Sequence, residues 1–122
     1  MNVFDASALL AYLGGEAGAA AVEEALEAGG AVSAVNWSEI AQKIRSRGRN
    51  WDLARSLLTS HDLDVEAVTA DDAEWAARRW RRDEGLSLAD RLCLALATRL
   101  EADAVWTADA LWGTTAPIRQ IR

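Results

Sequence analysis

The most continuously apolar part of the chain is LSLADRLCLALATRL, from Leu86 to Leu100. Leucines recur along it with alanines between them, and Thr98 is its single β-branched residue, so we predict a buried helix rather than a strand. Asp90 falls in the first turn of this helix, three residues after Ser87, which is the spacing of a capping box. A second interpretation is that Asp90 belongs to a functional site against which the helix packs.

Short apolar strands alternate with helices along the rest of the chain. Glycines end several of the helices, and Asn36 or Ser38 is expected to cap the helix that follows the second strand. In chain order the pattern predicts a strand at 1–4, helices at 6–13 and 16–28, a strand at 31–35, helices at 36–47 and 51–60, a strand at 63–68 with one polar face, helices at 69–83 and 87–100, a strand at 104–107, a short turn or helix at 108–112 and an edge strand at 118–121.

This alternation predicts crossover connections and a mainly parallel sheet of four or five strands with helices on both faces, a three-layer α/β/α sandwich. No internal repeat or linker divides the chain, so residues 1–122 are expected to form a single domain. Crossover helices run antiparallel to the strands, and helix beginnings therefore lie at the same edge as strand carboxyl ends. Open α/β sheets place their sites at that edge.

Composition limits the cellular setting. Half of the residues are hydrophobic, yet no apolar run reaches the length of a membrane span, and the first residues lack the pattern of a signal peptide. The single cysteine, Cys93, lies within the apolar helix and has no partner for an internal disulfide. We therefore expect a cytoplasmic protein that does not associate with membranes.

Four acidic residues map to the carboxyl edge of the predicted sheet. Asp5 directly follows the first strand, and Glu39 lies in the first turn of the helix entered from the second strand. Asp109 lies just past the fourth strand. Only Ala102 and Asp103 connect the helix of Asp90 to that strand, so the beginning of this helix also lies at the carboxyl edge. Four separate stretches thus direct one carboxylate each towards one region.

Clustered carboxylates raise one another's pKa, and protons or cations must compensate their charge. A hard divalent cation, Mg²⁺ or Mn²⁺, suits a site made of oxygen ligands. His61 and Cys93 are the only residues of their kinds, so a zinc site is not expected. An acidic site of this kind supports transfer or hydrolysis at phosphate, because the metal activates water and stabilises charge on the reacting oxygens.

At these residues the chain resembles the PIN domains, and specifically the VapC-type ribonuclease toxins of bacterial toxin–antitoxin pairs. The resemblance covers the whole chain, and it rests on four stretches taken together in the order of the family. These are Val3-Phe4-Asp5-Ala6-Ser7-Ala8-Leu9-Leu10-Ala11, Ser38-Glu39-Ile40, Leu86-Ser87-Leu88-Ala89-Asp90-Arg91-Leu92-Cys93-Leu94-Ala95 and Val105-Trp106-Thr107-Ala108-Asp109.

The resemblance implies a Mg²⁺- or Mn²⁺-dependent endoribonuclease whose metal-bound water attacks a phosphodiester of RNA. It also implies a cognate small antitoxin protein, a homodimer, and tRNA or ribosomal RNA as possible substrates. By resemblance, Asp5, Glu39, Asp90 and Asp109 are the catalytic, metal-binding acids, supported by hydrogen bonds from Ser7 and Thr107. Arg91, next to Asp90, is the basic residue proposed for substrate contact.

Other functions fit the sequence less well. A phospho-signalling receiver domain requires a lysine after its fifth strand, and the only lysine is Lys43. A phosphohydrolase with a D-x-D nucleophile is not indicated, because Asp5 is followed by Ala6-Ser7. The main alternative is a catalytically inactive PIN-fold module that binds RNA or an antitoxin. Loss of one of the four acids would have favoured this alternative, and all four are present.

The net charge of −6 is unusual for a nucleic-acid-binding protein, whose binding surface is generally basic. Arginines are nevertheless grouped at 45, 47 and 49 and again at 78, 79, 81 and 82. The simplest interpretation of the second group is a solvated helix face, with phosphate contact as the alternative. The six tryptophans are expected mainly in the core or in partner interfaces, with base stacking as the alternative.

Overall fold

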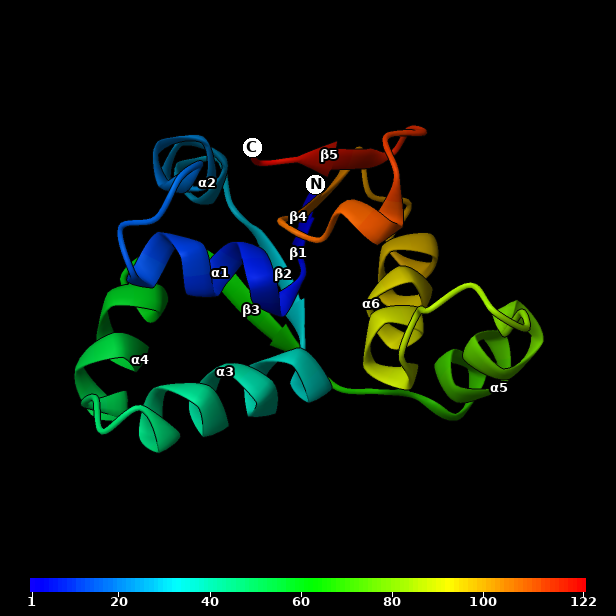
Figure 1. The fold of residues 1–122 in the computed structure, drawn as a ribbon, viewed down its shortest axis with the longest axis horizontal. Helices are drawn as coiled ribbons and strands as arrows, with labels where there is room; N and C mark the ends of the chain where they lie inside the picture. Colours follow the sequence, from blue (N-terminus) through cyan, green and yellow to red (C-terminus); the bar gives the residue numbers. More distant parts are fainter.

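The computed structural model describes residues 1–122, in which strands and helices alternate (Figure 1). The elements are β1 (Asn2–Phe4), α1 (Ala6–Leu13), α2 (Ala19–Glu27), β2 (Gly30–Ser33), α3 (Ala34–Ser46), α4 (Trp51–Thr59), β3 (Leu63–Glu66), α5 (Ala70–Arg79), α6 (Leu88–Arg99), β4 (Ala104–Thr107), the 3₁₀ turn η1 (Ala110–Trp112) and β5 (Ile118–Gln120).

The five strands form one sheet in the order β3-β2-β1-β4-β5, and every neighbouring pair is parallel. In the register of the sheet, Val3 of β1 lies beside Ala31 of β2 and Val105 of β4. The central strand β1 therefore has its carboxyl end between those of β2 and β4. This confirms the predicted parallel sheet and its common carboxyl edge.

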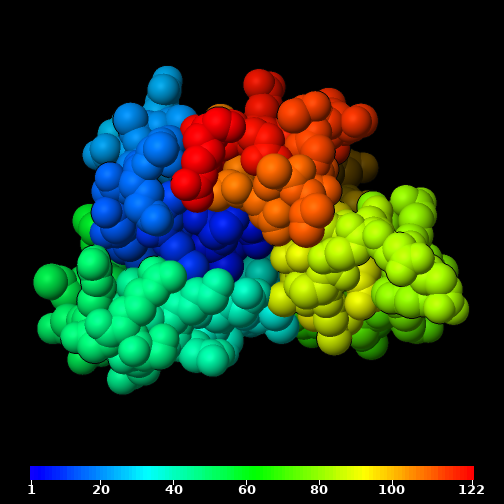
Figure 2. Space-filling view, viewed as in Figure 1, coloured from blue at the N-terminus to red at the C-terminus, as the bar shows by residue number.

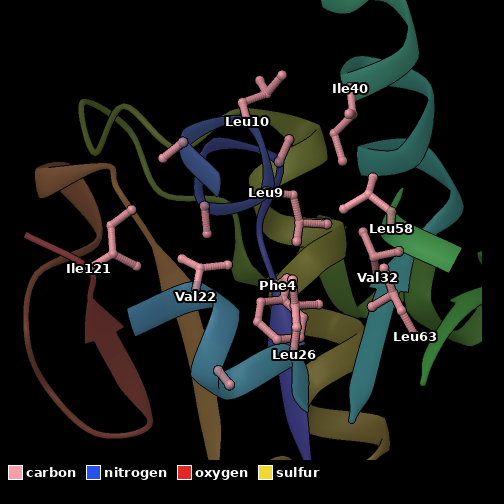
Figure 3. Packing of buried hydrophobic residues seen from close by; sticks show 14 of the residues in the cluster. Phe4, Leu9, Leu10, Val22, Leu26, Val32, Ile40, Leu58, Leu63 and Ile121 are labelled. Atoms are coloured by element: carbon pink, nitrogen blue, oxygen red, sulfur yellow. The ribbon is translucent and has the colours of Figure 1, made fainter. Parts of the chain in front are cut away.

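Helices cover both faces of the sheet, as the α/β/α prediction requires. Alternate strand residues point to opposite faces, so Phe4 and Val32 pack with α1 to α4, whereas Val3, Ala31 and Val105 pack with α6. Figure 3 shows the larger cluster around Phe4. On the other face α6 packs against the sheet, and α5 packs against α6 (Figure 1). None of the helices has the length and apolar character needed to cross a membrane.

Two helix beginnings differ from the prediction. Helix α3 starts at Ala34, because the Ser33 hydroxyl accepts a hydrogen bond of 3.2 Å from the Val35 N–H and caps it; neither Asn36 nor Ser38 is the cap. Helix α2 starts only at Ala19, after Gly18 with φ of 91°. A side chain at Gly18 would place its Cβ 2.4 Å from the carbonyl oxygen of Ile121, so glycine is required there.

Helix α5 and strand β3 also differ from the pattern. Helix α5 ends at Arg79 rather than at Asp83, because Trp80 is extended and the Arg79 guanidinium turns to pair with Glu84. In β3 Leu63 is buried but Val65 is exposed, so the predicted apolar face is incomplete. Since β3 is an edge strand, only its beginning is covered by the helical layer.

Candidate active site

Asp5 lies at the carboxyl end of the central strand. It directly follows β1 and precedes α1, and its backbone N–H donates a hydrogen bond of 2.9 Å to the Trp106 carbonyl of β4. The residue is only 4% exposed. The sheet topology thus places one carboxylate in a nearly solvent-free position at the edge where α/β sheets carry their sites.

Two hydroxyl groups hold the Asp5 carboxylate. Ser7 Oγ donates to Asp5 Oδ2 over 2.6 Å, and Thr107 Oγ1 donates to the same oxygen over 2.9 Å. Each hydroxyl oxygen also accepts a backbone hydrogen bond, Ser7 from the Ala108 N–H (2.9 Å) and Thr107 from the Asp109 N–H (3.0 Å). The backbone donors orient both hydroxyls, so their hydrogens are directed to Asp5.

The electrostatic environment of Asp5 is unfavourable to its charge. Burial raises the pKa of Asp5 from its ordinary value of 3.8 to about 6, against the lowering effect of the Ser7 and Thr107 hydrogen bonds. The charge of Asp90 adds to the rise. A buried carboxylate of this kind is stabilised when a proton or a cation compensates it, and such perturbed groups are concentrated at functional sites.

Asp90 caps α6 and at the same time lies in the neighbourhood of Asp5. The Ser87 hydroxyl accepts from the Asp90 N–H (3.0 Å), and Asp90 Oδ2 accepts from the Ser87 N–H (2.9 Å), which completes the capping box expected from the sequence. The other oxygen, Oδ1, accepts no hydrogen bond from the protein. The cap therefore fixes the orientation of the carboxylate and leaves one oxygen free.

Glu39 reaches the same region from α3. Its Oε1 accepts a hydrogen bond of 3.0 Å from Nδ2 of Asn36, one turn earlier in the helix. The thiol of Cys93 is fully buried in α6, and this burial raises its pKa well above the usual value. The negative charges of Asp5, Asp90 and Glu39 add to the rise. The charges of these three acids thus all act on the thiol of Cys93 in the first half of α6.

Asn36 is a residue of this region that the sequence indicated only as a helix cap and not as part of the site. It is completely buried, its Nδ2 donates to Glu39, and its Oδ1 has no hydrogen-bond partner. A buried amide with an unpaired oxygen costs stability, so such a group needs an explanation in function or in an additional ligand. The available signal was its spacing, since a residue three positions before Glu39 lies on the same face of a helix.

Asp109 is attached to the site through Thr107. Its backbone N–H donates to the Thr107 hydroxyl that holds Asp5. Its Oδ1 accepts from the Leu111 N–H (2.9 Å) and caps η1, while Oδ2 accepts no hydrogen bond from the protein. In this conformation the Asp109 carboxylate is turned towards the first turn of η1.

Arg91, proposed for substrate contact, lies between α5 and α6. Its Nη1 donates to the Ala76 carbonyl of α5 over 2.6 Å, and its Nε is buried without a partner. In this conformation the guanidinium joins the two helices instead of extending over the acids. Asp72 is likewise structural, because Arg99 binds its carboxylate through two hydrogen bonds and Thr69 completes a capping box with it.

No three acidic, histidine or cysteine side chains converge into a ready-made metal site. The chemistry of the donors nevertheless fits a hard cation, because the predicted ligands offer only oxygen atoms. Glu39, Asp90 and Asp109 each have one oxygen held by the protein and one without a hydrogen bond from it. The nitrogen donor of His61 is engaged with the Tyr12 hydroxyl. The Cys93 thiol is fully buried, and burial raises its pKa, which disfavours the thiolate that a metal would bind.

Comparisons with known proteins agree with this architecture. The PIN domain family matches residues 3–115 of the chain. A VapC ribonuclease of Mycobacterium bovis is 36% identical over 107 residues, which cover 78% of this chain and 81% of that protein. Ribonuclease VapC42 of Mycobacterium tuberculosis matches with the same identity and the same coverage.

Solved structures give the same fold. A protein of a toxin–antitoxin complex from Klebsiella pneumoniae superposes with a TM-score of 0.76 at 21% identity, covering 100% of this chain and 98% of that one. VapC20 of Mycobacterium tuberculosis, described as a toxin that cleaves the sarcin–ricin loop, superposes with a TM-score of 0.74 at 20% identity, covering 90% and 91%. Together with the family match, these similarities show that the chain belongs to the PIN-domain family and is of the VapC type.

Proposed function

We propose that this protein is a Mg²⁺- or Mn²⁺-dependent endoribonuclease that acts as the toxin of a toxin–antitoxin pair. The observation that carries the proposal is the buried Asp5 carboxylate, held by Ser7 and Thr107 and facing the charge of Asp90. The ribonuclease names of the relatives at 36% identity support the choice of RNA as substrate.

In this proposal Asp5, Glu39, Asp90 and Asp109 hold the divalent cation. When bound, such a cation activates water and neutralises charge on the scissile phosphate. The hydroxyls of Ser7 and Thr107 hold Asp5 Oδ2 in place, and this also fixes the orientation of the other carboxylate oxygen, Oδ1. The capping box does the same for Asp90, and Asn36 does so for Glu39. The protein therefore contributes carboxylates whose orientation is fixed before substrate arrives.

The proposal includes two partners besides RNA. A small antitoxin protein is proposed as the inhibitor, in keeping with the VapC type and with the toxin–antitoxin complex among the structural neighbours. A second copy of the chain is proposed to complete a homodimer.

One alternative is favoured by a specific observation. Asp90 and Asp109 both serve as caps, and no three acids form a ready-made metal site. A catalytically inactive PIN-fold module that binds RNA or an antitoxin would look like this. Metal binding and cleavage together distinguish the two functions.

The test is cleavage of total cellular RNA by the wild type, Asp5→Asn and Asp71→Asn, with Mg²⁺, with Mn²⁺ and with chelator. Asp71 is an exposed carboxylate in the first turn of α5 and serves as the matched control. We expect metal-dependent cuts that Asp5→Asn reduces roughly a hundredfold or more and that Asp71→Asn leaves unchanged. Calorimetric titration with Mn²⁺ should show binding to the wild type. Binding without cleavage of any RNA would favour the inactive module, and equal cleavage by Asp5→Asn would refute the assignment of Asp5.

A further inference from the structure

The last residues of α5 and the chain that follows them form an exposed basic and aromatic segment, residues 78–82, which we name the Arg–Trp loop. The side chains of Arg78, Arg81 and Arg82 are exposed, and Trp80 is 54% exposed. The other five tryptophans of the chain are buried or partly buried. Since tryptophan contributes a large apolar surface that proteins usually cover, an exposed indole beside three arginines indicates a binding surface.

Ion pairs give the Arg–Trp loop a defined shape. Arg79 pairs with Glu84 through two hydrogen bonds of 2.7 and 3.0 Å, which end α5 and turn the chain away from it. Arg81 approaches the same carboxylate only to 3.9 Å and its side chain stays 68% exposed. The Arg82 guanidinium lies 5.9 Å from the centre of the Trp80 ring. Three arginines thus remain available for a ligand, one of them beside the indole.

The loop lies at the same end of α6 as Asp90. Arg99 at the end of α6 bonds Asp72 at the start of α5, and Arg91 at the start of α6 bonds the Ala76 carbonyl late in α5. The two helices are therefore antiparallel, and the end of α5 lies beside the start of α6. Figure 2 shows this segment (yellow-green) on the surface next to the start of α6 (yellow). The loop therefore lies at the end of the α5–α6 pair at which Asp90 caps α6.

Charge decides which ligand this surface fits. The chain carries a net charge of −6, whereas residues 78–84 carry a positive excess. An acidic protein that binds a polyanion needs a local basic surface to offset its general repulsion. Arginines contact phosphates without regard to sequence, and an exposed indole stacks on any unpaired base.

We propose that the Arg–Trp loop binds single-stranded RNA next to the scissile phosphate, with a base stacked on Trp80 and phosphates bound by Arg78, Arg81 and Arg82. This inference rests on the proposed function, because it names where the RNA substrate lies relative to the acids. Single-stranded RNA is specified because a paired base has no free face to offer the indole.

Binding is measured separately from cleavage. In the Asp5→Asn background, fluorescence anisotropy would follow a fluorescein-labelled oligoadenylate strand and an RNA duplex of the same length. We expect Trp80→Ala to weaken binding of the single strand roughly tenfold and to change duplex binding little, while Trp80→Phe retains most of the affinity. Arg82→Gln should reduce the slope of log affinity against log salt by roughly 0.7.

Matched controls lie far along the fold from the loop. Leu53→Ala removes an exposed apolar side chain of α4, and Arg55→Gln removes an exposed arginine of the same helix; both should leave strand binding unchanged. Unchanged strand binding in Trp80→Ala would overturn the inference. If, in addition, size-exclusion chromatography showed that Trp80→Ala dissociates a dimer, the loop would instead be an interface between copies of the chain.

The inference and the proposed function fail in different ways. If the wild type cuts no RNA but Trp80→Ala binds the single strand more weakly, the Arg–Trp loop is retained as an RNA-binding surface. The proposal that the protein is a nuclease is then rejected. If the wild type cuts RNA and Trp80→Ala has the same kcat and the same KM, the nuclease proposal is retained. The proposal that the Arg–Trp loop binds the substrate is then rejected.

Discussion

The hydroxyl of Thr107 donates a hydrogen bond of 2.9 Å to Oδ2 of Asp5, joining two residues that are 102 positions apart in the chain. They lie at the carboxyl ends of the paired strands β4 and β1. A hydroxyl has one hydrogen, and because the Asp109 N–H already occupies the Thr107 oxygen as donor, that hydrogen is directed to the carboxylate. The sheet thus fixes the orientation of Asp5 as well as its position.

Thr107→Val removes this hydroxyl and keeps the shape of the side chain. We expect cleavage to fall roughly 10- to 100-fold, as when a group that orients a metal ligand is lost. The free energy of unfolding should fall by about 1–3 kcal/mol, because the Asp109 N–H loses its acceptor. Thr98→Val is the matched control, since the Thr98 hydroxyl bonds only the Leu94 carbonyl on exposed α6 surface. Full cleavage by Thr107→Val would show that this hydroxyl does not position Asp5.

Ser87→Ala and Asp90→Asn separate the capping role of Asp90 from its proposed ligand role. Ser87→Ala removes the hydroxyl half of the capping box and should cost about 1 kcal/mol of stability while folded enzyme remains active. Asp90→Asn keeps an oxygen for the Ser87 N–H but loses the charge, so cleavage should fall far more than stability does. Thermal denaturation and initial cleavage rates measure the two effects. Parallel losses in both variants would make Asp90 a cap alone.

Asn36→Leu tests whether the buried amide serves Glu39. Leucine has the same branched shape and is larger, and the substitution also removes the unpaired Oδ1; the two effects on the free energy of unfolding oppose each other, so stability should change little. Cleavage should fall roughly tenfold, because Glu39 Oε1 loses the donor that holds it. A change in which stability is retained and activity falls is not expected of a purely structural residue. The control is Gln42→Leu, an exposed position of the same helix.

The local pattern of the sequence was sufficient for much of the fold. Helix α1 and strand β4 have the predicted bounds, since each is delimited by residues within a few positions of its ends. The position of Asp5 at the carboxyl edge follows from topology, because parallel strands and crossover helices share that edge. That Asp5, Glu39, Asp90 and Asp109 together hold a metal stays a prediction.

The structure differs from the predictions where a contact between residues far apart in the sequence, or between packed elements, determines the local conformation. Helix α5 was predicted too long because the Arg79–Glu84 pair, which turns the chain after Arg79, is not part of a helical pattern. Trp80 was expected in the core or in a partner interface; it is not in the core, because the helix ends before it. Arg91 was proposed for substrate through its position beside Asp90, but consecutive residues of a helix face different directions, and Arg91 lies against α5.

Asp5 should make the metal-free protein less stable as pH rises. Its folded pKa of about 6 exceeds the ordinary 3.8, so the folded state binds the proton more tightly than the unfolded state does. The free-energy cost of burying the ionised carboxylate is absent below pH 3.8 and grows between pH 3.8 and about pH 6. Above about pH 6 it is constant. The difference corresponds to at most about 3 kcal/mol.

Asp5→Asn removes this charge while an amide oxygen can still accept from Ser7 and Thr107. We therefore expect Asp5→Asn to be more stable than the wild type at neutral pH, with the two stability curves converging near pH 4. Saturating Mn²⁺ should stabilise the wild type, because a ligand that binds only the folded state adds to its stability, and should have less effect on Asp5→Asn. Chemical denaturation across the pH range, with and without Mn²⁺, measures both effects. A wild-type curve that does not decline between pH 4 and pH 6 relative to Asp5→Asn would show that burial of this carboxylate carries no cost for a cation to relieve.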